Sequence, residues 1–167
     1  LVTALERGDS IAILGDYDVD GVTSTALLVD ALRTFGADPR FYVPLRLVEG
    51  YGLTAAALER VMRDGRPDLF IALDCGTNSV EEVEALRAEG IEVLVVDHHR
   101  SREETPEDCL LVNPHVDGNG ATPWKNLCTV GLVFKLVHGL VKRLRELGNA
   151  TAEALDLKSY LDFVALG

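Results

Sequence analysis

Three aspartates, Asp16, Asp18 and Asp20, stand at alternate positions within the stretch "GDYDVDG" at residues 15–21. Like charges at this spacing repel one another, so the group lowers stability unless a cation, a proton or a hydrogen-bond network compensates it. A single aspartate in such a place is also common in turns, because its carboxylate can bond nearby backbone. For Asp16, both a turn or capping role and metal ligation are therefore open.

Two further groups of chemistry-bearing residues follow apolar runs later in the chain. Asp74 opens "DCGT" at residues 74–77, and Asp97 opens "DHH" at residues 97–99. Oxygen ligands with one or two imidazoles suit Mn²⁺ or a similar first-row ion, with Mg²⁺ as the alternative. Several carboxylates, of which one can bridge, are typical of a site holding two metal ions about 3.5–4 Å apart. The expected metal ligands are Asp18, Asp20, Asp74 and His98, with Asp16 as a further candidate.

His98 and His99 are adjacent, so on an extended backbone their side chains point in opposite directions. In the functional interpretation, one imidazole binds a metal and the other faces a substrate phosphate. In the alternative, one of them is a histidine packed beneath the loop with its hydrogen bonds satisfied. Spacing alone does not decide between these interpretations.

Small and hydroxyl-bearing residues beside these groups are candidates for contact with a phosphate. Gly21 precedes a helix N-terminus, whose free amides and dipole favour an anion. Thr23 and Ser24 add hydroxyl donors or else cap that helix. Gly76 and Thr77 form a second small turn, and we expect its backbone amides to face a phosphate.

The elements that must position these residues alternate between strand and helix patterns. The expected strands are 10–17, 39–44, 68–74, 91–97 and 109–112. The expected helices are 22–35, 54–63, one opened by the capping box "SVEE" at 79–82 and stopped by Gly90, 127–147, and one from Thr151 to the chain end. This alternation predicts an α/β fold, Rossmann-like, with a mostly parallel sheet of about five strands and helices on both faces. Ligands of such sheets bind beyond the carboxyl ends of the strands, where all three groups converge.

Composition narrows the class of protein. The length of 167 residues suits one domain. The net charge of −11 argues against a protein that binds nucleic acid by bulk electrostatic attraction, although bound metal ions can invert the local field. Three cysteines are too few for a disulfide framework or a zinc ribbon, which predicts a reducing cytoplasm. We find no secretory leader, and no apolar run approaches the roughly 20 residues of a membrane span.

Two protein families with different functions share part of this pattern of aspartates at strand ends. "DVDGVT" at 18–23 fits the loop of haloacid dehalogenase-like phosphatases, with Asp18 as nucleophile and Asp20 as acid and base. A signalling receiver domain, which is a non-enzymatic switch, also has acids after its first strand and an aspartate after its third. A receiver domain requires a lysine at the end of one of its last strands, and it has no pair of adjacent histidines. Neither family explains all three groups.

The motifs "GDYDVDGVTS", "DCGT" and "VDHH", in this order, resemble the first three motifs of the DHH phosphoesterase superfamily. Four flanking stretches resemble segments of the bacterial single-strand-specific exonucleases within it. They are "YVPLRLVEGYGL" at 42–53, "LVNPH" at 111–115, "LCTVGLVFKL" at 127–136 and "YLDFVALG" at 160–167. The resemblance therefore covers nearly the whole chain.

This resemblance implies a role for each matching residue. Asp18 would bind one metal and Asp20 the other, Asp74 would bridge them, His98 would ligate, and His99 would contact the scissile phosphate. Further implied or candidate residues are Asp16 as a ligand or an acceptor beside the ligands, Asp97 orienting the imidazoles, and Arg100, Asn113 and His115 on the substrate side. Tyr51 is a candidate for stacking on a base.

The implied reaction is two-metal hydrolysis, with Mn²⁺ or Mg²⁺, that removes 5′-mononucleotides from single-stranded DNA in recombination and repair. Relatives that keep this site act on short oligonucleotides, cyclic dinucleotides or pyrophosphate, and others are non-catalytic scaffolds. Leu14 stands where several relatives have a histidine. We expect residues 1–167 to be a DHH catalytic subdomain that stops before the fourth motif and a second domain. We expect this part alone to turn over poorly.

Overall fold

The computed structural model describes residues 1–102, 104–116 and 123–167, whose strands form one parallel sheet in the order β2-β1-β3-β4-β5. The strands are β1 (Ile11–Gly15), β2 (Arg40–Tyr42), β3 (Leu69–Leu73), β4 (Glu92–Val96) and β5 (Leu110–Val112). The predicted α/β class is confirmed, and so is the fifth strand. Each strand is shorter than predicted, although the amides of Asp16, Asp74 and Asp97, which directly follow β1, β3 and β4, still donate to the neighbouring strand.

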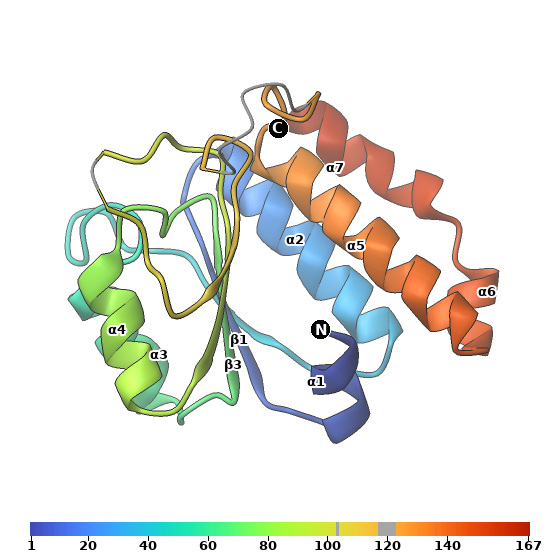
Figure 1. Cartoon of the computed structure of the whole chain (residues 1–167), viewed down its shortest axis with the longest axis horizontal. Helices are drawn as coiled ribbons and strands as arrows, with labels where there is room; N and C mark the ends of the chain where they lie inside the picture. The colour runs from blue at the N-terminus through green and yellow to red at the C-terminus, as the bar shows by residue number, and fades with distance from the viewer. Residues whose placement is uncertain (103, 117–122) are drawn as a thin grey trace.

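Helices cover both faces of the sheet, as predicted. They are α1 (Val2–Arg7), α2 (Val19–Thr34), α3 (Ala55–Arg63), α4 (Val80–Ala88), α5 (Thr129–Glu146), α6 (Ala150–Ala154) and α7 (Leu161–Leu166), with a 3₁₀ turn, η1, at Leu157–Tyr160. Figure 1 shows α3 and α4 on one side of the sheet, and α2, α5 and α7 on the other. Among the residues that the structure describes, no helix is long and apolar enough to cross a membrane.

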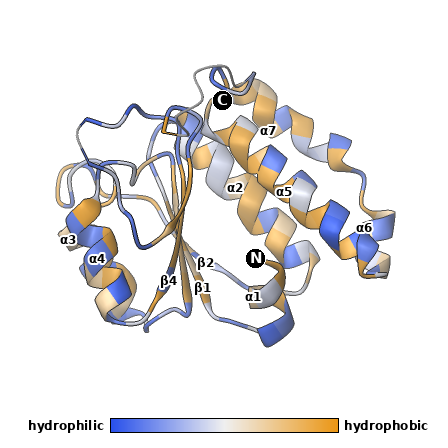
Figure 2. Ribbon diagram, viewed as in Figure 1, coloured by the Kyte–Doolittle hydropathy of each residue, from blue (hydrophilic) through white to orange (hydrophobic). Residues whose placement is uncertain are grey.

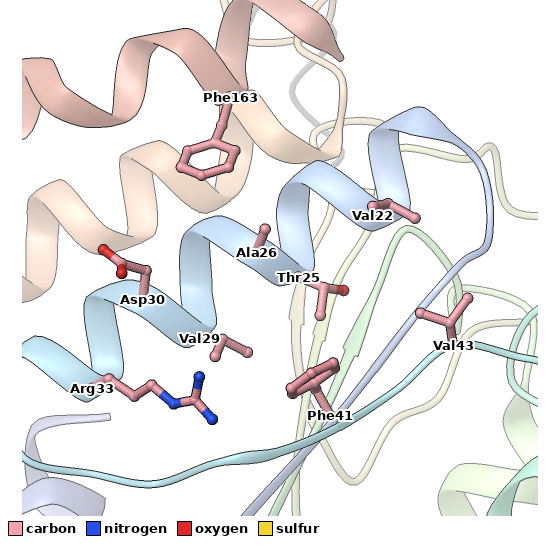
Figure 3. A pocket seen from close by; sticks show the side chains of 9 residues that line it. All are labelled: Val22, Thr25, Ala26, Val29, Asp30, Arg33, Phe41, Val43 and Phe163. Atoms are coloured by element: carbon pink, nitrogen blue, oxygen red, sulfur yellow. The ribbon is translucent and has the colours of Figure 1, made fainter.

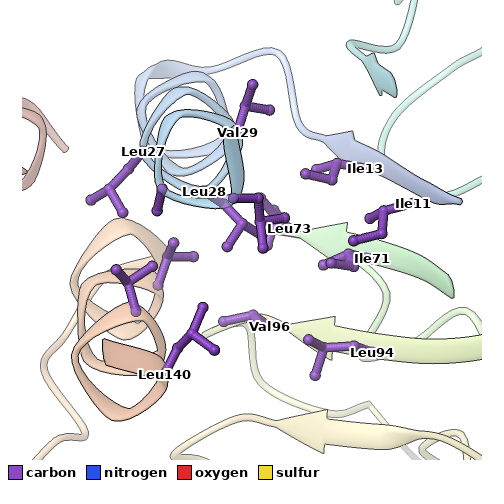
Figure 4. Close-up of a cluster of buried hydrophobic side chains, with 14 of the residues drawn as sticks. Ile11, Ile13, Leu27, Leu28, Val29, Ile71, Leu73, Leu94, Val96 and Leu140 are labelled. Carbon is purple, nitrogen blue, oxygen red and sulfur yellow. The ribbon is translucent and has the colours of Figure 1, made fainter. Parts of the chain in front are cut away.

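The strands divide the hydrophobic core into two layers, because successive side chains point to opposite faces. Ile13 and Ile71 point towards α2 and α5, whereas Leu14 and Phe70 belong to the cluster beneath α3 and α4. Figure 4 shows the first layer, in which strand side chains meet Leu28 and its neighbours on α2. In Figure 2 the apolar colour runs through the centre of the molecule, and the hydrophilic colour gathers on helix and loop surfaces. This packing fixes the sheet edge that carries the polar groups.

Helix α2 begins at Val19, three residues earlier than predicted. The Asp18 carboxylate accepts a hydrogen bond from the amide of Gly21 at 3.0 Å and so caps the helix. Asp20 therefore lies in the first helical turn and not in a loop. The prediction that the first helix starts at Val22 is wrong because Asp18 satisfies an amide of the earlier turn.

Two other helix predictions also need correction. Ser79 does precede α4, but its hydroxyl donates to the carbonyl of Leu53 at 3.2 Å instead of capping the helix. The final segment is not one helix, because α6 ends at Ala154 and the chain is extended at Leu155 and Asp156. The predicted cap of α3 by Thr54 is confirmed, since its hydroxyl accepts from Ala57 at 3.3 Å.

Candidate metal centre

The two glycines that flank "GDYDVDG" let α2 approach the end of β1 closely. A side-chain carbon on Gly21 would lie 2.6 Å from the carbonyl carbon of Asp16, and one on Gly15 would lie 2.9 Å from the carbonyl oxygen of Gly21. Real atoms cannot approach so closely, so neither position accepts a larger residue without a backbone shift. The close approach fixes Asp16 and Asp18 at the carboxyl end of β1.

Asp16 and Asp74 are buried at this edge of the sheet, with exposed fractions of 0% and 1%. Neither oxygen of Asp16, and only one oxygen of Asp74, has a hydrogen-bond partner among the described residues. Burial raises the pKa of Asp16, and burial with the charge of Asp20 raises the pKa of Asp74 to about 8. Buried carboxylates without donors need a proton or a cation, so the residues present fit a bound metal ion.

The backbone of Asp74 has a φ of 61°, and no other described residue except glycine has a positive φ. Such a conformation costs energy for a residue with a side chain and is found mostly at functional sites. The turn brings the Asp74 carboxylate towards α5, where the Thr129 hydroxyl donates to its Oδ1 at 2.8 Å. The left-handed turn thus aims Asp74 at the centre of the acidic group.

Two clusters of possible ligand atoms share Asp74. One joins Asp16, Asp18 and Asp74, and the other joins Asp74, His98 and His99, with the atoms of each cluster within 4.8 Å of one another. His98 Nε2 lies 3.4 Å from Asp74 Oδ1. A carboxylate shared by two clusters is the arrangement that a two-metal site requires.

Asp20 belongs to neither cluster and instead caps a helix distant in sequence. Its Oδ2 accepts from the amide of Thr129 and its Oδ1 from the amide of Val130, each at 2.7 Å. This carboxylate at the N-terminus of α5 compensates the helix dipole and two free amides. Its Oδ2 also lies 3.6 Å from His98 Nε2, so Asp20 stays at the margin of the second cluster.

Asp97 holds His99 in place. Its Oδ1 accepts from the amides of His98 and His99 and lies 2.8 Å from His99 Nδ1, and its Oδ2 accepts from the amide of Thr77. The hydrogen bond to Asp97 raises the pKa of His99 to about 9. Burial opposes ionisation of Asp97, but the hydrogen bonds from His99 and Thr77 outweigh it and hold its pKa below the usual range. Asp97 therefore orients the His99 ring and favours its protonated form.

The structure turns several predicted phosphate contacts into internal supports. The Thr23 hydroxyl donates to the carbonyl of Val19 at 2.7 Å, and the Thr77 hydroxyl accepts from Asn113 Nδ2 at 2.8 Å. The Thr77 amide also donates to Asp97. The Thr23 hydroxyl and the Thr77 amide thus bond within the fold in this structure, and phosphate contact by either residue stays a prediction.

The other predicted substrate residues divide between the interior and the surface. Ser24 is fully buried, and its hydroxyl has no partner among the described residues. Asn113, also buried, donates to the carbonyl of His99 at 2.8 Å and accepts from the amide of His115 at 2.8 Å. Gly76 and the exposed Arg100 line a pocket beside His99.

Sequence analysis missed three residues around the site. Thr129 bonds Asp74, Tyr17 packs edge-on against Tyr51 with ring centroids 5.9 Å apart, and the Arg46 guanidinium lies 5.1 Å from the Tyr17 ring centre. Tyr51, predicted as a substrate contact, places its hydroxyl 3.4 Å from His99 Nε2. Tyr17 lies inside the aspartate motif, so its position was a usable signal, whereas Thr129 had none.

An apolar pocket of about 370 Å³ lies away from these clusters, between α2, β2 and α7. Figure 3 shows Val22, Val29, Phe41 and Phe163 around it. Two charged residues, Asp30 and Arg33, line this pocket. Its lining contains no histidine and no second acidic residue. It lacks the groups for metal or phosphate chemistry.

Together, the parallel sheet and the aspartates and histidines at its carboxyl edge define an α/β domain with a candidate metal centre. The sequence profile described as "DHH family, N-terminal domain" matches residues 10–167, so this chain belongs to the DHH family. The resemblance of the three motifs is thereby confirmed.

Within the DHH family, the chain is similar to RecJ exonucleases. The chain is 41% identical over 169 residues to the single-stranded-DNA-specific exonuclease RecJ of Haemophilus influenzae, a match that covers 100% of this chain and 29% of the relative. A crystal structure of exonuclease RecJ bound to manganese matches with a TM-score of 0.82 and 33% identity, over 98% of this chain and 39% of that one. RecJ of Thermus thermophilus in complex with Mn²⁺ matches with a TM-score of 0.75 and 31% identity, over 98% and 22%. The chain thus spans under two fifths of each of these three proteins.

Proposed function

We propose that this chain is the catalytic DHH subdomain of a Mn²⁺-dependent exonuclease that degrades single-stranded DNA from its 5′ end. The observation that carries this proposal is the pair of buried carboxylates of Asp16 and Asp74, of which only Asp74 Oδ1 has a hydrogen-bond partner among the described residues. A cation at the edge where the histidine pair lies would compensate their charge. The similarity to RecJ supports single-stranded DNA as the substrate. Release of 5′-mononucleotides as the reaction, and repair and recombination as the setting, belong to the proposal through the resemblance of the motifs alone.

The residues that hold the metal ions in this proposal are Asp16, Asp18, Asp20, Asp74 and His98. Asp74 would be a ligand of both ions, since it belongs to both clusters. Asp20 accepts two backbone amides, but each carboxylate oxygen has a second lone pair for a metal. When bound, two Mn²⁺ ions polarise the phosphodiester and supply a hydroxide at neutral pH.

Four further residues, Asp97, His99, Thr129 and Asn113, orient the ligands or place a positive charge at the site. Asp97 keeps the proton of His99 on Nδ1, which leaves Nε2 for an oxygen of the scissile phosphate. With a pKa of about 9, His99 carries a positive charge at neutral pH and stabilises negative charge on that oxygen. Thr129 fixes the rotation of the Asp74 carboxylate, and Asn113 fixes the backbone of His99.

We further propose that the active enzyme includes a second domain and works in the cytoplasm, and that this subdomain by itself turns over poorly. Support for the second domain comes from the match to the N-terminal domain of the family and from the 29% coverage of the Haemophilus relative. Three cysteines that form no disulfide suit a reducing compartment.

The test is release of labelled mononucleotides from single-stranded DNA by the full-length protein in Mn²⁺. A 5′ label should appear as mononucleotide at once and a 3′ label only at the end, while duplex DNA should resist. Asp74→Asn should abolish release, whereas Asp38→Asn, an exposed carboxylate paired with Arg33, should not change it. Faster hydrolysis of dinucleotides than of long strands would contradict the exonuclease proposal, as would full activity of Asp74→Asn.

A further inference from the structure

We propose that a polar pocket beside His99 binds a phosphate of the substrate strand next to the scissile one, with Arg100 and Arg102 as its cations. This arginine pocket is lined by Tyr51, Asn78, His99, Arg100 and Arg102 among others, and its volume is about 270 Å³. The inference rests on the proposed function and extends it to the part of the strand that is not cleaved.

The arginine pocket adjoins the metal centre through one side chain. His99 lines it, and the same ring places Nδ1 4.0 Å from Asp74 Oδ1. On the pocket side, the Tyr51 hydroxyl lies 3.4 Å from His99 Nε2. A strand whose scissile phosphate contacts His99 therefore has the arginine pocket directly beside it.

The charge of the arginine pocket is opposite to that of the whole chain. The chain carries a net charge of −11, yet the charged side chains lining this pocket are Asp97, His99, Arg100 and Arg102. Asp97 is already neutralised, because His99 Nδ1 and three backbone amides surround its two oxygens. The net charge of the side chains that line the pocket is therefore positive, which favours the binding of an anion.

Both guanidinium groups are available for a ligand. Neither Arg100 nor Arg102 forms an ion pair with a carboxylate of the described residues, whereas Arg60 pairs with Glu49 at 2.7 Å and Arg87 with Asp108 at 3.0 Å. A planar guanidinium presents paired donors that match phosphate oxygens, so two of them suit a phosphate better than a neutral base.

Hydrogen bonds from Asn78 hold the loop that carries the two arginines in the ligand-free structure. Asn78 Oδ1 accepts from the amide of Arg102 at 2.8 Å, and its Nδ2 donates to the carbonyl of Arg100 at 3.3 Å. A single side chain thus ties the backbone of both arginines to the turn after β3. This fastening reduces the ordering that binding would otherwise require.

The first experiment measures the salt dependence of DNA binding. Full-length wild type, Arg100→Gln, Arg102→Gln, the double variant and Arg63→Gln are titrated with a fluorescent single-stranded oligonucleotide in EDTA over a range of KCl. Arg63 is an exposed arginine of α3 and controls for loss of one charge. The double variant should weaken binding about tenfold and lower the slope of log K against log salt by about 0.7, since the pocket holds one phosphate and each phosphate contact contributes about 0.7. A slope equal to that of wild type and Arg63→Gln overturns the proposal.

The second experiment separates the arginine pocket from the metal centre. In Mn²⁺, the double variant should hydrolyse bis(p-nitrophenyl) phosphate as fast as wild type but show about a tenfold higher KM for a long oligonucleotide. Equal loss on both substrates would make the arginines part of the fold or of the metal centre and overturns the pocket. If wild type hydrolyses neither substrate while the slope difference persists, the proposed function fails and the pocket stands.

A third experiment uses inorganic phosphate as the probe. It tests whether the arginine pocket binds a free phosphate ion instead of a phosphate of the DNA strand. If the arginine pocket holds a free phosphate ion from solution instead of the strand, the double variant should lose inhibition by inorganic phosphate with an unchanged slope for DNA. That result overturns the strand proposal. A neutral methylphosphonate at one linkage beside the cleaved bond should weaken wild type but not the double variant, which would confirm it.

Discussion

The Thr129 hydroxyl donates to Oδ1 of Asp74 at 2.8 Å, and this hydrogen bond joins residues 55 positions apart. Thr129 opens α5, and its amide is in turn held by Asp20 at the start of α2. Two helices and a strand are therefore joined around one buried carboxylate. The helix contacts that build the core also determine which way Asp74 points.

Replacing Thr129 tests this support directly. Thr129→Val keeps the shape of the side chain and removes the donor, so we expect Mn²⁺ affinity to fall about 10- to 100-fold, as is typical when a hydrogen bond to a ligand is lost. Thr129→Ser should stay near wild type. Calorimetric titration with Mn²⁺ measures both, and equal affinity in the two variants would show that the hydrogen bond does not orient Asp74.

The metal-free protein should lose stability as the pH rises from about 6 to 9. Folded Asp74 keeps its proton up to a pKa of about 8, whereas the unfolded chain releases it near about 4, so the folded state binds more protons in between. His99 acts in the same direction, because its stabilising charge is present below about pH 6.5 and is lost as the pH passes its folded pKa of about 9.

The measurement is the Tm in EDTA at several pH values. Wild type should melt at a lower temperature at each step upwards, and Asp74→Asn should show a smaller fall that reflects His99. Saturating Mn²⁺ should raise the Tm most at high pH, where the carboxylates are charged. A Tm that is flat or rising with pH in EDTA would contradict the role of burial at Asp74.

Gly21 should not tolerate a side chain. Because its added carbon would meet the backbone of Asp16, Gly21→Ala should destabilise the protein by about 3 kcal/mol or more. Gly139 is the matched control, since it lies within α5 with nothing within 4 Å of an added carbon. Gly139→Ala should stabilise by about 1 kcal/mol. Urea unfolding of both variants checks the pair, and a small cost at Gly21 would mean that α2 can move away from β1.

Asp20 should contribute to stability even without metal. Asp20→Ala removes two charge-assisted hydrogen bonds from the first amides of α5, and we expect a loss of about 2 kcal/mol in EDTA. Asp20→Asn keeps one acceptor oxygen and should lose less. Urea unfolding in EDTA separates this role from ligation, and an unchanged free energy of unfolding for Asp20→Ala would show that α5 does not depend on the cap.

The sequence by itself determined the α/β class and the edge of the sheet at which the chemistry gathers. Five short apolar runs alternating with helical patterns leave few arrangements other than a parallel sheet, and in such a sheet the carboxyl ends of the strands meet. Asp18 shares one cluster of possible ligands with Asp74, and His98 shares the other, so these residues lie at the predicted edge while their role as ligands stays a prediction. The same order of motifs also led to the DHH family, because "GDYDVDG", "DCGT" and "VDHH" are local patterns.

Only the tertiary structure decided how the polar groups share their partners. Asp20 caps a helix 109 residues further along the chain, and Thr77 and Asn113 turn inwards to support His99. It also gave the two histidines distinct places, with His99 held by Asp97 and His98 beside Asp74. Spacing cannot supply these facts, because a hydrogen bond between distant residues depends on how helices pack, whereas a strand or a turn depends on its neighbours in the chain.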